Sequence, residues 1–264
     1  MTNPRRLSII LPSYNDARIE RAIRSIRAFD DAAIVKVVVV DGGSRPEILE
    51  LIRKGLSPCD VLVSEPDRGI FDALNKGLDL CDTELVGWLG SDDLFTGNVL
   101  ASRVAMHLED ADLLVARGAL FRGEYITRVT PSAPSRLGLV KYGFNNHHFA
   151  TFGTARLLKS ERFSLALRGS DIEYFLKIFA RKPRVVALSE IVTLGEEGGF
   201  STRSRRNLLD THLPLVPVYA GHTSLVSAWV ATVAKLGYKL CQRVYFTVVR
   251  RRARDCSPLA RDLL

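Results

Sequence analysis

The sequence lacks the patterns that mark several common kinds of site. Its four cysteines form no CxxC pair and have no histidine at a zinc-ligand spacing: Cys59, Cys81, Cys241 and Cys256. It contains no GxGxxG, no GxxxxGK(S/T) and no GxSxG, which argues against a dinucleotide dehydrogenase, a P-loop enzyme and an α/β-hydrolase. The N-terminus has no basic segment followed by an apolar run, so we expect no secretory signal, and free thiols in a reducing cytoplasm.

The main body has no excess of positive charge. Residues 1–200 contain 26 Lys+Arg and 26 Asp+Glu, whereas residues 201–264 contain 11 against 3, which accounts for the whole net charge of +8. This distribution argues against a nucleic-acid groove in the body, and we expect no nucleic-acid partner. It also predicts a boundary near residue 200, with a domain at 1–203 and a basic tail at 204–264.

What is present fits a folded α/β protein. With 264 residues, 47% of them hydrophobic and 25% charged, the chain is long enough for one large domain and an appendage. Because apolar runs of strand length alternate with helix-length segments, the sequence predicts a parallel sheet covered on both faces. The expected strands are 7–11, 34–40, 60–65 and 84–90, and the expected helices are 17–28, 46–55 and 70–80.

A polar motif follows each of these strands, where ligands bind in such sheets. PSYND follows the first strand, DGGSR the second, EPDRG the third and GSDD the fourth. In the last motif two like charges, Asp92 and Asp93, stand side by side, and they need a cation, a helix cap or water to compensate them. Asp is a preferred N-cap residue, so capping of a following helix is one interpretation.

The order of these motifs resembles that of the family 2 glycosyltransferases, which have the GT-A fold. The resemblance rests on PSYN, VVVDGGS, SEPDRGIFDALNKGL, WLGSDD, the segment His148–Phe152, RGSDIEYFL and GGFS, and it covers roughly residues 5–203. It implies a GT-A-like, Rossmann-type nucleotide-binding sheet flanked by helices, with a donor half at about 5–115 and an acceptor half at about 116–203.

The resemblance implies a divalent cation, Mg²⁺ or Mn²⁺, that bridges the donor's diphosphate. Asp92 would be its principal ligand and Asp93 a neighbouring one. Such ions prefer oxygen ligands and need only one or two protein carboxylates beside phosphate oxygens. Many members of the family read DSDD or NSDD where this chain has GSDD, so an oxygen ligand is missing at Gly90.

The resemblance also implies donor contacts in the motifs at the strand ends. Asp41 would bind the base or ribose of the nucleotide, and its alternative is an ordinary turn acid. Tyr14 is equally explained as an aromatic residue at the rim. In the segment 70–80 polar residues recur at i, i+3, i+4 and i+7, which a surface helix with an Asp72–Lys76 ion pair also explains. The expected donor-binding residues are Pro12, Tyr14, Asn15, Asp41, Asp67, Arg68, Asp72, Asn75, Lys76 and Ser91.

Sugar transfer with inversion needs a group that takes the proton of the acceptor hydroxyl. By resemblance this general base is Asp171 in RGSDIEYFL, with Glu173 as the alternate. Because SDIE opens an apolar helical run, capping of that helix by Ser170 or Asp171 is a second interpretation.

Two further segments are implied to border the site. His148 would steady phosphate or complete the metal shell, and its alternative is a buried, hydrogen-bonded histidine. Gly198 and Gly199 would give the freedom for a flap over the site, and their alternative is an ordinary glycine turn.

Residues 223–249 predict a basic amphipathic helix, and the cationic run RRRAR follows it. Lys235, Lys239 and Arg243 recur every four residues, with the apolar residues largely on the other side. This pattern is typical of a segment at an anionic membrane surface, and packing onto the domain is the alternative. The uncharged stretch 213–234 is interrupted by prolines and Gly221, which argues against a membrane span. We expect a peripheral position at the inner face of the cytoplasmic membrane.

Together these features predict an inverting, metal-dependent glycosyltransferase of the hexosyltransferase type. The expected donor is a nucleotide-diphosphate sugar of the UDP or GDP type. The expected acceptor is a glycan, linked to a polyprenyl diphosphate, in bacterial polysaccharide biosynthesis. Two other interpretations stay open, namely a non-catalytic sugar-nucleotide-binding or membrane-scaffold protein, and a nucleotidyltransferase.

Overall fold

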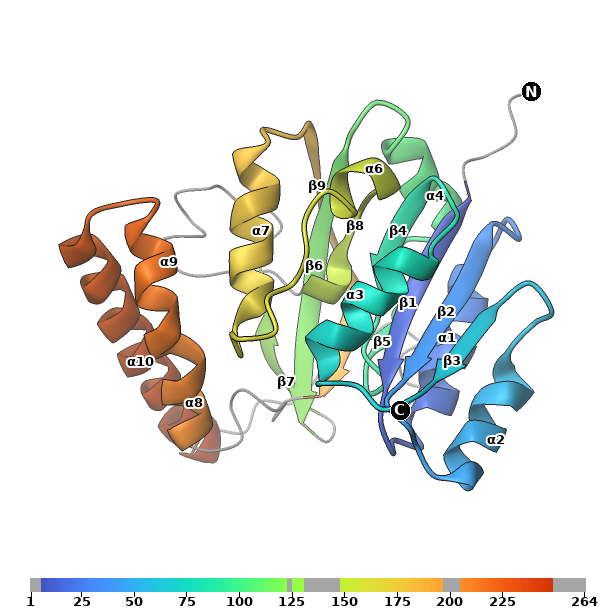
Figure 1. The fold of residues 1–264 in the computed structure, drawn as a ribbon, viewed down its shortest axis with the longest axis horizontal. Helices are drawn as coiled ribbons and strands as arrows, with labels where there is room; N and C mark the ends of the chain where they lie inside the picture. The colour runs from blue at the N-terminus through green and yellow to red at the C-terminus, as the bar shows by residue number, and fades with distance from the viewer. Residues whose placement is uncertain (1–5, 123–124, 131–147, 197–204, 249–264) are drawn as a thin grey trace.

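The chain folds around a nine-stranded mixed sheet with helices on both faces (Figure 1). This computed structural model describes residues 6–122, 125–130, 148–196 and 205–248. The strands are β1 (Leu7–Ser13), β2 (Val35–Asp41), β3 (Val61–Ser64), β4 (Leu85–Trp88), β5 (Leu94–Phe95), β6 (Leu113–Arg122), β7 (Tyr125–Val129), β8 (Thr151–Thr154) and β9 (Val185–Glu196). The helices are α1 (Ile19–Phe29), α2 (Pro46–Gly55), α3 (Ile70–Leu80), α4 (Ala101–His107), α6 (Ala155–Leu158), α7 (Ser170–Ala180), α8 (Arg205–His212), α9 (Val216–Ala220) and α10 (Leu225–Val248).

The first four strands form the parallel half of the sheet, in the order β3-β2-β1-β4. The strands and helices expected between residues 7 and 90 are all confirmed, with ends shifted by at most two residues. Because β2 lies on one side of β1 and β4 on the other, the strand order reverses between β1 and β4. Ligands of open α/β sheets bind at such a switch point, outside the carboxyl ends of the strands.

Beyond β4 the sheet departs from the expected parallel arrangement. β8 runs antiparallel to β4, and β6 runs antiparallel to β8. The carbonyl oxygen of His148, shortly before β8, accepts a hydrogen bond of 2.5 Å from Nε1 of Trp88, the last residue of β4. β8 therefore starts where β4 ends and runs back along it.

α3 and α7 cover the near face of the sheet in Figure 1, and α1 covers the far face. The contact between α3 and β1 depends on Gly77, since a Cβ atom there would lie 2.3 Å from Cγ2 of Ile10. Ile10 is fully buried, so its side chain has little room to move away. This close approach fixes α3, with its polar residues, on the sheet.

An aromatic cluster holds α7 against the end of β4. The ring of Trp88 makes edge contacts with Phe163, Tyr174 and Phe175 at centroid distances of 5.8, 5.9 and 6.0 Å. The hydroxyl of Tyr174 donates to the carbonyl oxygen of Leu158 over 2.6 Å, so this buried polar group is satisfied. The first turn of α7 is thereby placed near the carboxyl end of β4.

The helices α8, α9 and α10 pack beside α7 (Figure 1). Ile172 and Leu176 of α7 share a buried apolar cluster with Leu215, Val216 and Tyr219. Packing onto the domain, the alternative interpretation of the tail, is therefore observed at the residues of this cluster, which extends to Ala228 at the start of α10. None of the helices in the described ranges is long and apolar enough to cross a membrane.

The helix expected at residues 223–249 is confirmed as α10, but its expected basic face is wrong at Lys235. This side chain is buried, and its Nζ lies 2.5 Å from the hydroxyl oxygen of Tyr219 on α9. The side chains of Lys239 and Arg243 lie outside what the structure describes. The reason for the error is that periodicity separates two helix faces without indicating which one faces the protein.

Candidate active site

Two neighbouring carboxylates follow the end of β4, at the switch point of the sheet. The residues after Asp92 and Asp93 form the strand β5, and α4 begins only at Ala101. The helix-cap interpretation of this pair is therefore wrong. A Cβ atom on Gly90 would lie 2.7 Å from Oδ2 of Asp93 and 3.0 Å from Oδ1 of Asp92. Because glycine has no side chain, both carboxylates can lie close to the backbone at position 90. This is the physical reason for glycine here.

Arg18 joins Asp92 of this pair to two further carboxylates, Asp16 and Glu196, in a cluster that the sequence motifs did not indicate. Its Nε lies 2.9 Å from Oδ1 of Asp16, and its Nη1 lies 2.5 Å from Oε2 of Glu196. Its Nη2 lies 3.8 Å from Oδ2 of Asp92. The hydroxyl of Ser91 donates to Oδ2 of Asp16 over 3.0 Å, which ties the end of β1 to the end of β4.

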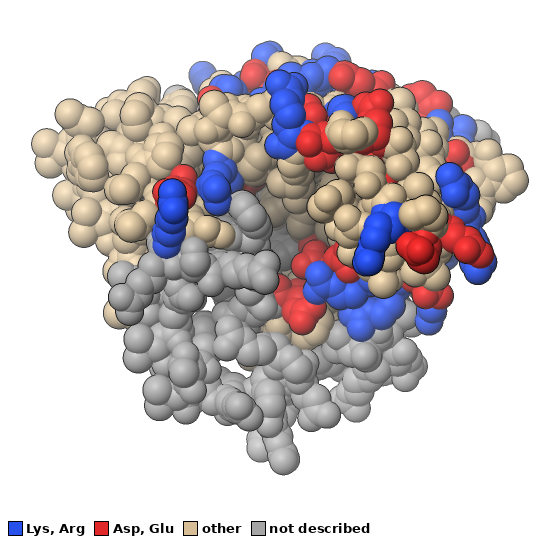
Figure 2. Space-filling view, turned by 60° about the horizontal axis from the view of Figure 1, so that its bottom comes forward, with Lys and Arg blue, Asp and Glu red and all other residues tan. Residues whose placement is uncertain are grey.

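The molecule is hollowed on the side where β1 and β4 end (Figure 2). Figure 2 looks at the side of the molecule where β1 and β4 end, and it shows acidic and basic side chains gathered at the edge of this hollow. On the other side of the hollow stands a lobe with few charged residues, at the place of α8, α9 and α10 in Figure 1. The hollow is therefore bordered by the sheet ends on one side and by the C-terminal helices on the other (Figure 1 and Figure 2).

The negative charges of the carboxylate pair are only partly compensated. Burial and the charge of Asp92 raise the pKa of Asp93 well above its usual range. Burial also raises the pKa of Asp92, although the charge of Arg18 opposes this shift. For Asp16 burial acts upward as well, but the hydrogen bonds from Arg18 lower its pKa overall. A cation beside Asp92 and Asp93 would relieve this repulsion.

His148 connects the carboxylate pair with the expected general base. Its Nδ1 lies 3.9 Å from Oδ2 of Asp171, and both side chains are about three-quarters buried. Burial lowers the pKa of His148, while the charges of Asp171 and Asp92 act in the opposite direction. The imidazole is therefore mainly neutral at pH 7, within electrostatic range of both acids.

Asp171 and Glu173 lie in the first turn of α7 but point to different sides. Side chains two residues apart on a helix differ in direction by about 200°. Glu173 pairs with Lys177 of the same helix over 2.9 Å, whereas Asp171 faces His148. The N-cap residue of α7 is Gly169, and no side chain makes a capping hydrogen bond. The capping interpretation of Ser170 and Asp171 is therefore wrong in this structure.

The turn after β2 uses Asp41 internally. Asp41 is fully buried, and its Oδ2 accepts hydrogen bonds from the backbone N–H groups of Gly43 (3.1 Å) and Ser44 (2.8 Å) and from the hydroxyl of Ser64 (2.8 Å). Its Oδ1 accepts from the hydroxyl of Ser44 over 2.5 Å. The backbone N–H of Asn15 donates to that hydroxyl oxygen over 2.6 Å, so the ends of β1 and β2 are joined. These contacts favour the interpretation of Asp41 as a turn acid that shapes the pocket wall.

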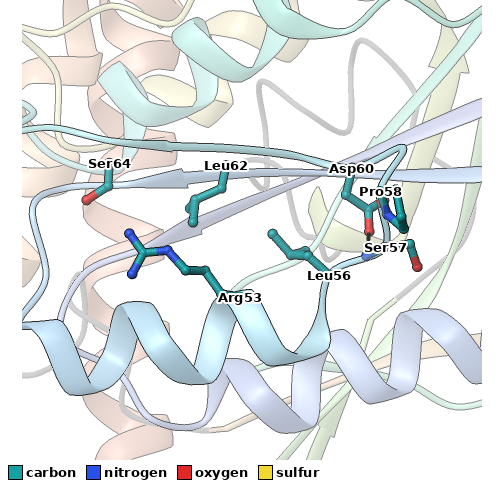
Figure 3. Close-up of a pocket in the computed structure, with 7 residues that line it drawn as sticks. All are labelled: Arg53, Leu56, Ser57, Pro58, Asp60, Leu62 and Ser64. Atoms are coloured by element: carbon teal, nitrogen blue, oxygen red, sulfur yellow. Dashed lines mark hydrogen bonds between the residues drawn. The ribbon is translucent and has the colours of Figure 1, made fainter.

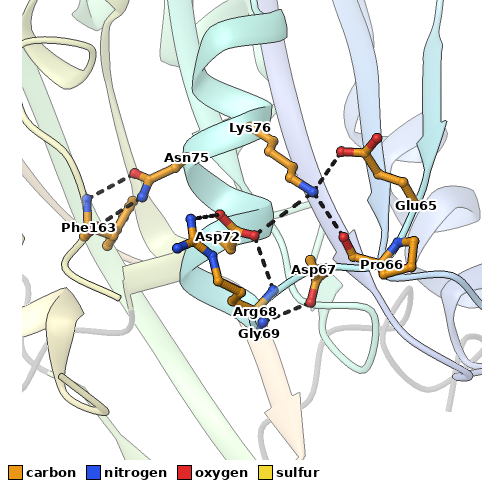
Figure 4. Close-up of polar contacts among 9 residues, drawn as sticks. All are labelled: Glu65, Pro66, Asp67, Arg68, Gly69, Asp72, Asn75, Lys76 and Phe163. Carbon is orange, nitrogen blue, oxygen red and sulfur yellow. Dashed lines mark hydrogen bonds and ion pairs between the residues drawn. The ribbon is translucent and has the colours of Figure 1, made fainter. Parts of the chain in front are cut away.

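The loop between β3 and α3, together with the first turns of α3, contains four expected donor residues that lie close together (Figure 4). Asp72 accepts hydrogen bonds from the backbone N–H and the Nη2 of Arg68, at 3.1 and 3.4 Å. Oδ1 of Asp67 accepts from the backbone N–H two residues further on, over 2.8 Å. Nζ of Lys76 lies 2.7 Å from Oε1 of Glu65 and 3.9 Å from Oδ2 of Asp72. The ion pair expected for a surface helix is present, and it is part of a larger network at the site's edge.

Three other expected donor residues take no part in this network: Asn75, Tyr14 and Pro12. The side-chain amide of Asn75 bonds both backbone groups of Phe163, at 2.9 and 3.0 Å (Figure 4), and so links α3 to the chain before α7. Tyr14 is 66% exposed, as a residue at the rim would be, while Pro12 is buried inside β1. Gly198 and Gly199, expected to form a flap, lie outside the described residues.

The carboxylate pair suits a divalent cation that takes further ligands from elsewhere. Asp92 and Asp93 offer the oxygen ligands that Mg²⁺ and Mn²⁺ prefer. Within the described ranges, no group of three or more His, Cys, Asp or Glu side chains is arranged to hold a metal ion. The residues therefore fit an ion that is completed by diphosphate oxygens and water. The cysteines that the structure describes are free, as expected: Cys59, Cys81 and Cys241.

A groove of about 680 Å³ between α2 and β3 is separate from this site (Figure 3). In the strand order β3-β2-β1-β4 the groove lies at the β3 edge, and the candidate site lies at β4. The one acid that lines the groove, Asp60, is paired with Arg27. Only Ser64 connects the groove with the site, through the hydrogen bond to Asp41. Its lining residues are Arg53, Leu56, Ser57, Pro58, Asp60, Leu62 and Ser64.

The sheet order and the acids at its switch point agree with the GT-A-like fold that the sequence motifs implied. Residues 8–161 match the family model described as glycosyl transferase family 2, and the chain belongs to this family. An uncharacterized glycosyltransferase of Mycobacterium tuberculosis is 34% identical over 110 residues, which are 39% of this chain and 40% of that protein. A PGL/p-HBAD biosynthesis glycosyltransferase of Mycobacterium bovis is 33% identical over 114 residues, 40% of this chain and 44% of that protein. The alignments thus span less than half the length of these relatives.

Solved structures show the same fold at low sequence identity. The mannosyltransferase PcManGT from Pyrobaculum calidifontis, in complex with GDP-Man and Mn²⁺, has a TM-score of 0.58 at 18% identity, covering 99% of this chain and 79% of that one. S. aureus TarS 1–349 in complex with UDP-GlcNAc has a TM-score of 0.59 at 18% identity, covering 92% and 73%. Glucosyl-3-phosphoglycerate synthase from Mycobacterium tuberculosis, in complex with Mn²⁺, UDP and glucosyl-3-phosphoglycerate, has a TM-score of 0.54 at 18% identity, covering 82% of this chain and 80% of that one.

Proposed function

We propose that this chain transfers a sugar from a nucleotide-diphosphate donor to a hydroxyl group of a glycan, with inversion at the anomeric carbon. The observation that carries the proposal is the position of His148, 3.9 Å from Asp171 and within the electrostatic range of Asp92. A base and donor-side carboxylates at one site are what a transfer between two bound substrates requires. The nucleotides in the neighbouring structures, UDP, UDP-GlcNAc and GDP-Man, support a donor of the UDP or GDP type.

In the proposed reaction the acceptor oxygen bonds to the anomeric carbon, and the bond from that carbon to the diphosphate oxygen breaks. Asp171 takes the proton of the acceptor hydroxyl, and the nucleoside diphosphate leaves on the opposite face. Arg18, whose Nε and Nη2 donate to the carboxylate of Asp16, adds a fixed positive charge beside the diphosphate. A divalent cation held by Asp92 and Asp93, Mg²⁺ or Mn²⁺, would neutralise charge on the leaving diphosphate.

The other expected donor residues are proposed either to contact the donor or to hold the wall of its pocket. Ser91, Arg68 and Lys76 are proposed to contact the donor, because Ser91 precedes the carboxylate pair directly and the other two belong to the loop after β3 and to α3. Asn15 and Asp41 are proposed to hold the turns that form the pocket wall, since their polar groups bond to these turns.

The acceptor is proposed to be a polyprenyl-diphosphate-linked glycan of bacterial polysaccharide biosynthesis, at the inner face of the cytoplasmic membrane. The basic sequence at 239–264 supports an anionic membrane surface as partner. The name of one relative, which concerns PGL/p-HBAD biosynthesis, is consistent with a lipid-borne acceptor.

A product analysis tests the proposed reaction. The chain is incubated with UDP- and GDP-sugars, Mn²⁺ and a polyprenyl-diphosphate-linked saccharide, and the released nucleotide and the anomeric configuration of the product are determined. We expect a nucleoside diphosphate and an inverted product. Release of pyrophosphate would instead identify a nucleotidyltransferase, and donor binding without any release would identify a non-catalytic protein.

A further inference from the structure

The outer side of α10 exposes a continuous apolar stripe. Val226, Trp229, Val230 and Val233 recur at i, i+3, i+4 and i+7, and they are 47% to 73% exposed. Leu225, at the start of the helix, is 60% exposed. Residues at this spacing lie on one face of a helix. We call these five residues the α10 stripe.

The inner side of the same helix carries small and polar residues. Ala228 and Thr232 are fully buried, and the hydroxyl of Thr232 donates to the carbonyl oxygen of Ala228. Lys235 is buried as well, with its Nζ 4.2 Å from the centre of the Tyr219 ring. A helix of a water-exposed protein normally buries its apolar side. Here that side faces outward, which calls for an apolar environment outside the protein.

We propose that the α10 stripe inserts into the interfacial region of an anionic lipid bilayer. This inference rests on the proposed function, which includes a lipid-linked acceptor. It adds the surface of the protein that would bring the site to that acceptor. Two features of the chain favour lipid. Trp229 is a residue type that prefers the membrane interface. The sequence after α10 contains Arg250, Arg251, Arg252 and Arg254, and their charges complement anionic headgroups.

The size of the stripe argues against a second copy of the chain as the occupant. Nine helical residues from 225 to 233 span only about 13 Å, and a helix with side chains is about 10 Å wide. The stripe therefore covers far less than the roughly 800 Å² per partner of a stable protein interface. Insertion into a bilayer has no such minimum area. Figure 2 also shows few charged side chains on the lobe at this side of the molecule.

The packing of the helices limits the distance between the α10 stripe and the candidate base, Asp171. α10 packs on α9, and Tyr219 of α9 packs with Ile172 of α7, next to Asp171. Axes of packed helices are about 8–10 Å apart, so two such steps separate α10 from α7 by roughly 20 Å at most. An acceptor hydroxyl on a short glycan close to the headgroups is thus within reach of the site.

Vesicle binding by the full chain tests the proposal. The wild type and the double variant Val226→Glu/Val230→Glu are floated with phosphatidylcholine vesicles, with and without phosphatidylglycerol. We expect the wild type to bind the anionic vesicles, and the double variant to bind at least about tenfold more weakly. The matched control is Met106→Glu on α4, which changes a residue that is 57% exposed away from the stripe and should bind like the wild type.

Tryptophan fluorescence reports on the stripe itself. The chain has two tryptophans, and Trp88 is only 1% exposed, so a blue shift on adding vesicles must come from Trp229. We expect this shift in the wild type and its loss in Trp229→Phe. Calorimetric binding of UDP and GDP is measured on every variant, which separates failure of the membrane contact from failure of the donor site and reports on folding.

Three results would overturn the proposal. The first is a wild type that stays unbound with both kinds of vesicle, and the second is equal binding by the wild type and the double variant. The third is a wild-type dimer in light scattering that the double variant converts to a monomer, since the stripe would then be an interface between two copies.

Discussion

Asp171 is the residue on which the proposed chemistry depends most. It faces His148, and no capping hydrogen bond depends on it. We predict that Asp171→Asn lowers kcat about 10²- to 10⁴-fold, the usual range for loss of a general base, with nucleotide binding and Tm nearly unchanged. The matched control is Glu173→Gln, which alters the acid that pairs with Lys177. An active Asp171→Asn together with an inactive Glu173→Gln would reverse the assignment.

Arg18 is a fixed cation among three carboxylates. Removing it takes a fixed positive charge from beside the diphosphate and leaves Asp16, Asp92 and Glu196 less compensated. We predict that Arg18→Gln weakens UDP or GDP binding about tenfold or more in calorimetry with Mn²⁺. Arg24→Gln on the same helix removes only an exposed pair with Glu20 and should bind like the wild type. Equal affinities of Arg18→Gln and the wild type would refute this role.

Asp93 gives a prediction for the dependence of stability on pH. Its raised pKa means that the folded state holds the proton more tightly than the unfolded state, so stability is present at low pH and lost as pH rises through the raised pKa. We predict that Asp93→Asn, which cannot ionise, has a higher Tm than the wild type at pH 7–8 in EDTA. The difference should shrink as pH falls toward about 4, the usual pKa of Asp. Thermal unfolding across this range would contradict us if the difference grew toward acid.

At the scale of helices, α3 and α10 each contain an interior glycine, with opposite surroundings. A Cβ on Gly77 would meet Ile10 at 2.3 Å, whereas a Cβ on Gly237 would meet nothing within 4 Å. Alanine favours a helix over glycine by up to about 1 kcal/mol, but overpacking a core costs about 1–3 kcal/mol. We predict that Gly77→Ala lowers the free energy of unfolding and weakens nucleotide binding, because α3 carries Lys76.

Gly237→Ala serves as the control for that change. With open space around position 237, we expect it to raise the free energy of unfolding by up to about 1 kcal/mol, without affecting nucleotide binding. Denaturant titration of both variants measures the two effects. A stabilised Gly77→Ala would show that Ile10 yields at little cost and that the close packing of α3 on β1 is not required.

Short-range patterns account for what could be predicted among these elements. The alternation of apolar runs and helical segments placed β1 to β4 and α1 to α3 within two residues of their observed ends. β5 could not be predicted, because its two residues are a strand only through pairing with β9, about a hundred residues further on. The orientation of α10 could not be predicted either, because it depends on the contact of Lys235 with Tyr219.

The candidate site shows the same limit. The acids at Asp92 and Asp93 and the histidine at His148 stand within recognisable motifs, so they could be expected together. Arg18 and Glu196 are 178 residues apart in sequence, and the position of Glu196 depends on the pairing of β9 with β5 and β6. A local motif carries no information on such a contact.

At the scale of the whole molecule, the site is assembled from three parts of the chain. The sheet ends contribute Arg18 and the carboxylate pair, the segment before β8 contributes His148, and α7 contributes Asp171. α7 in turn packs on α9 through Ile172 and Tyr219. We therefore expect the C-terminal helices to be needed for the position of the base as well as for any contact with a membrane.

The central claim is that the carboxylate pair at the switch point binds a nucleotide diphosphate together with a divalent cation. Calorimetric titration of the full chain with UDP and with GDP, each with Mn²⁺ and with EDTA, tests it most directly when repeated on Asp92→Ala. The account predicts metal-dependent binding of one of the two nucleotides by the wild type and its loss in the variant. Binding of neither nucleotide, or equal binding in EDTA and by Asp92→Ala, would contradict it.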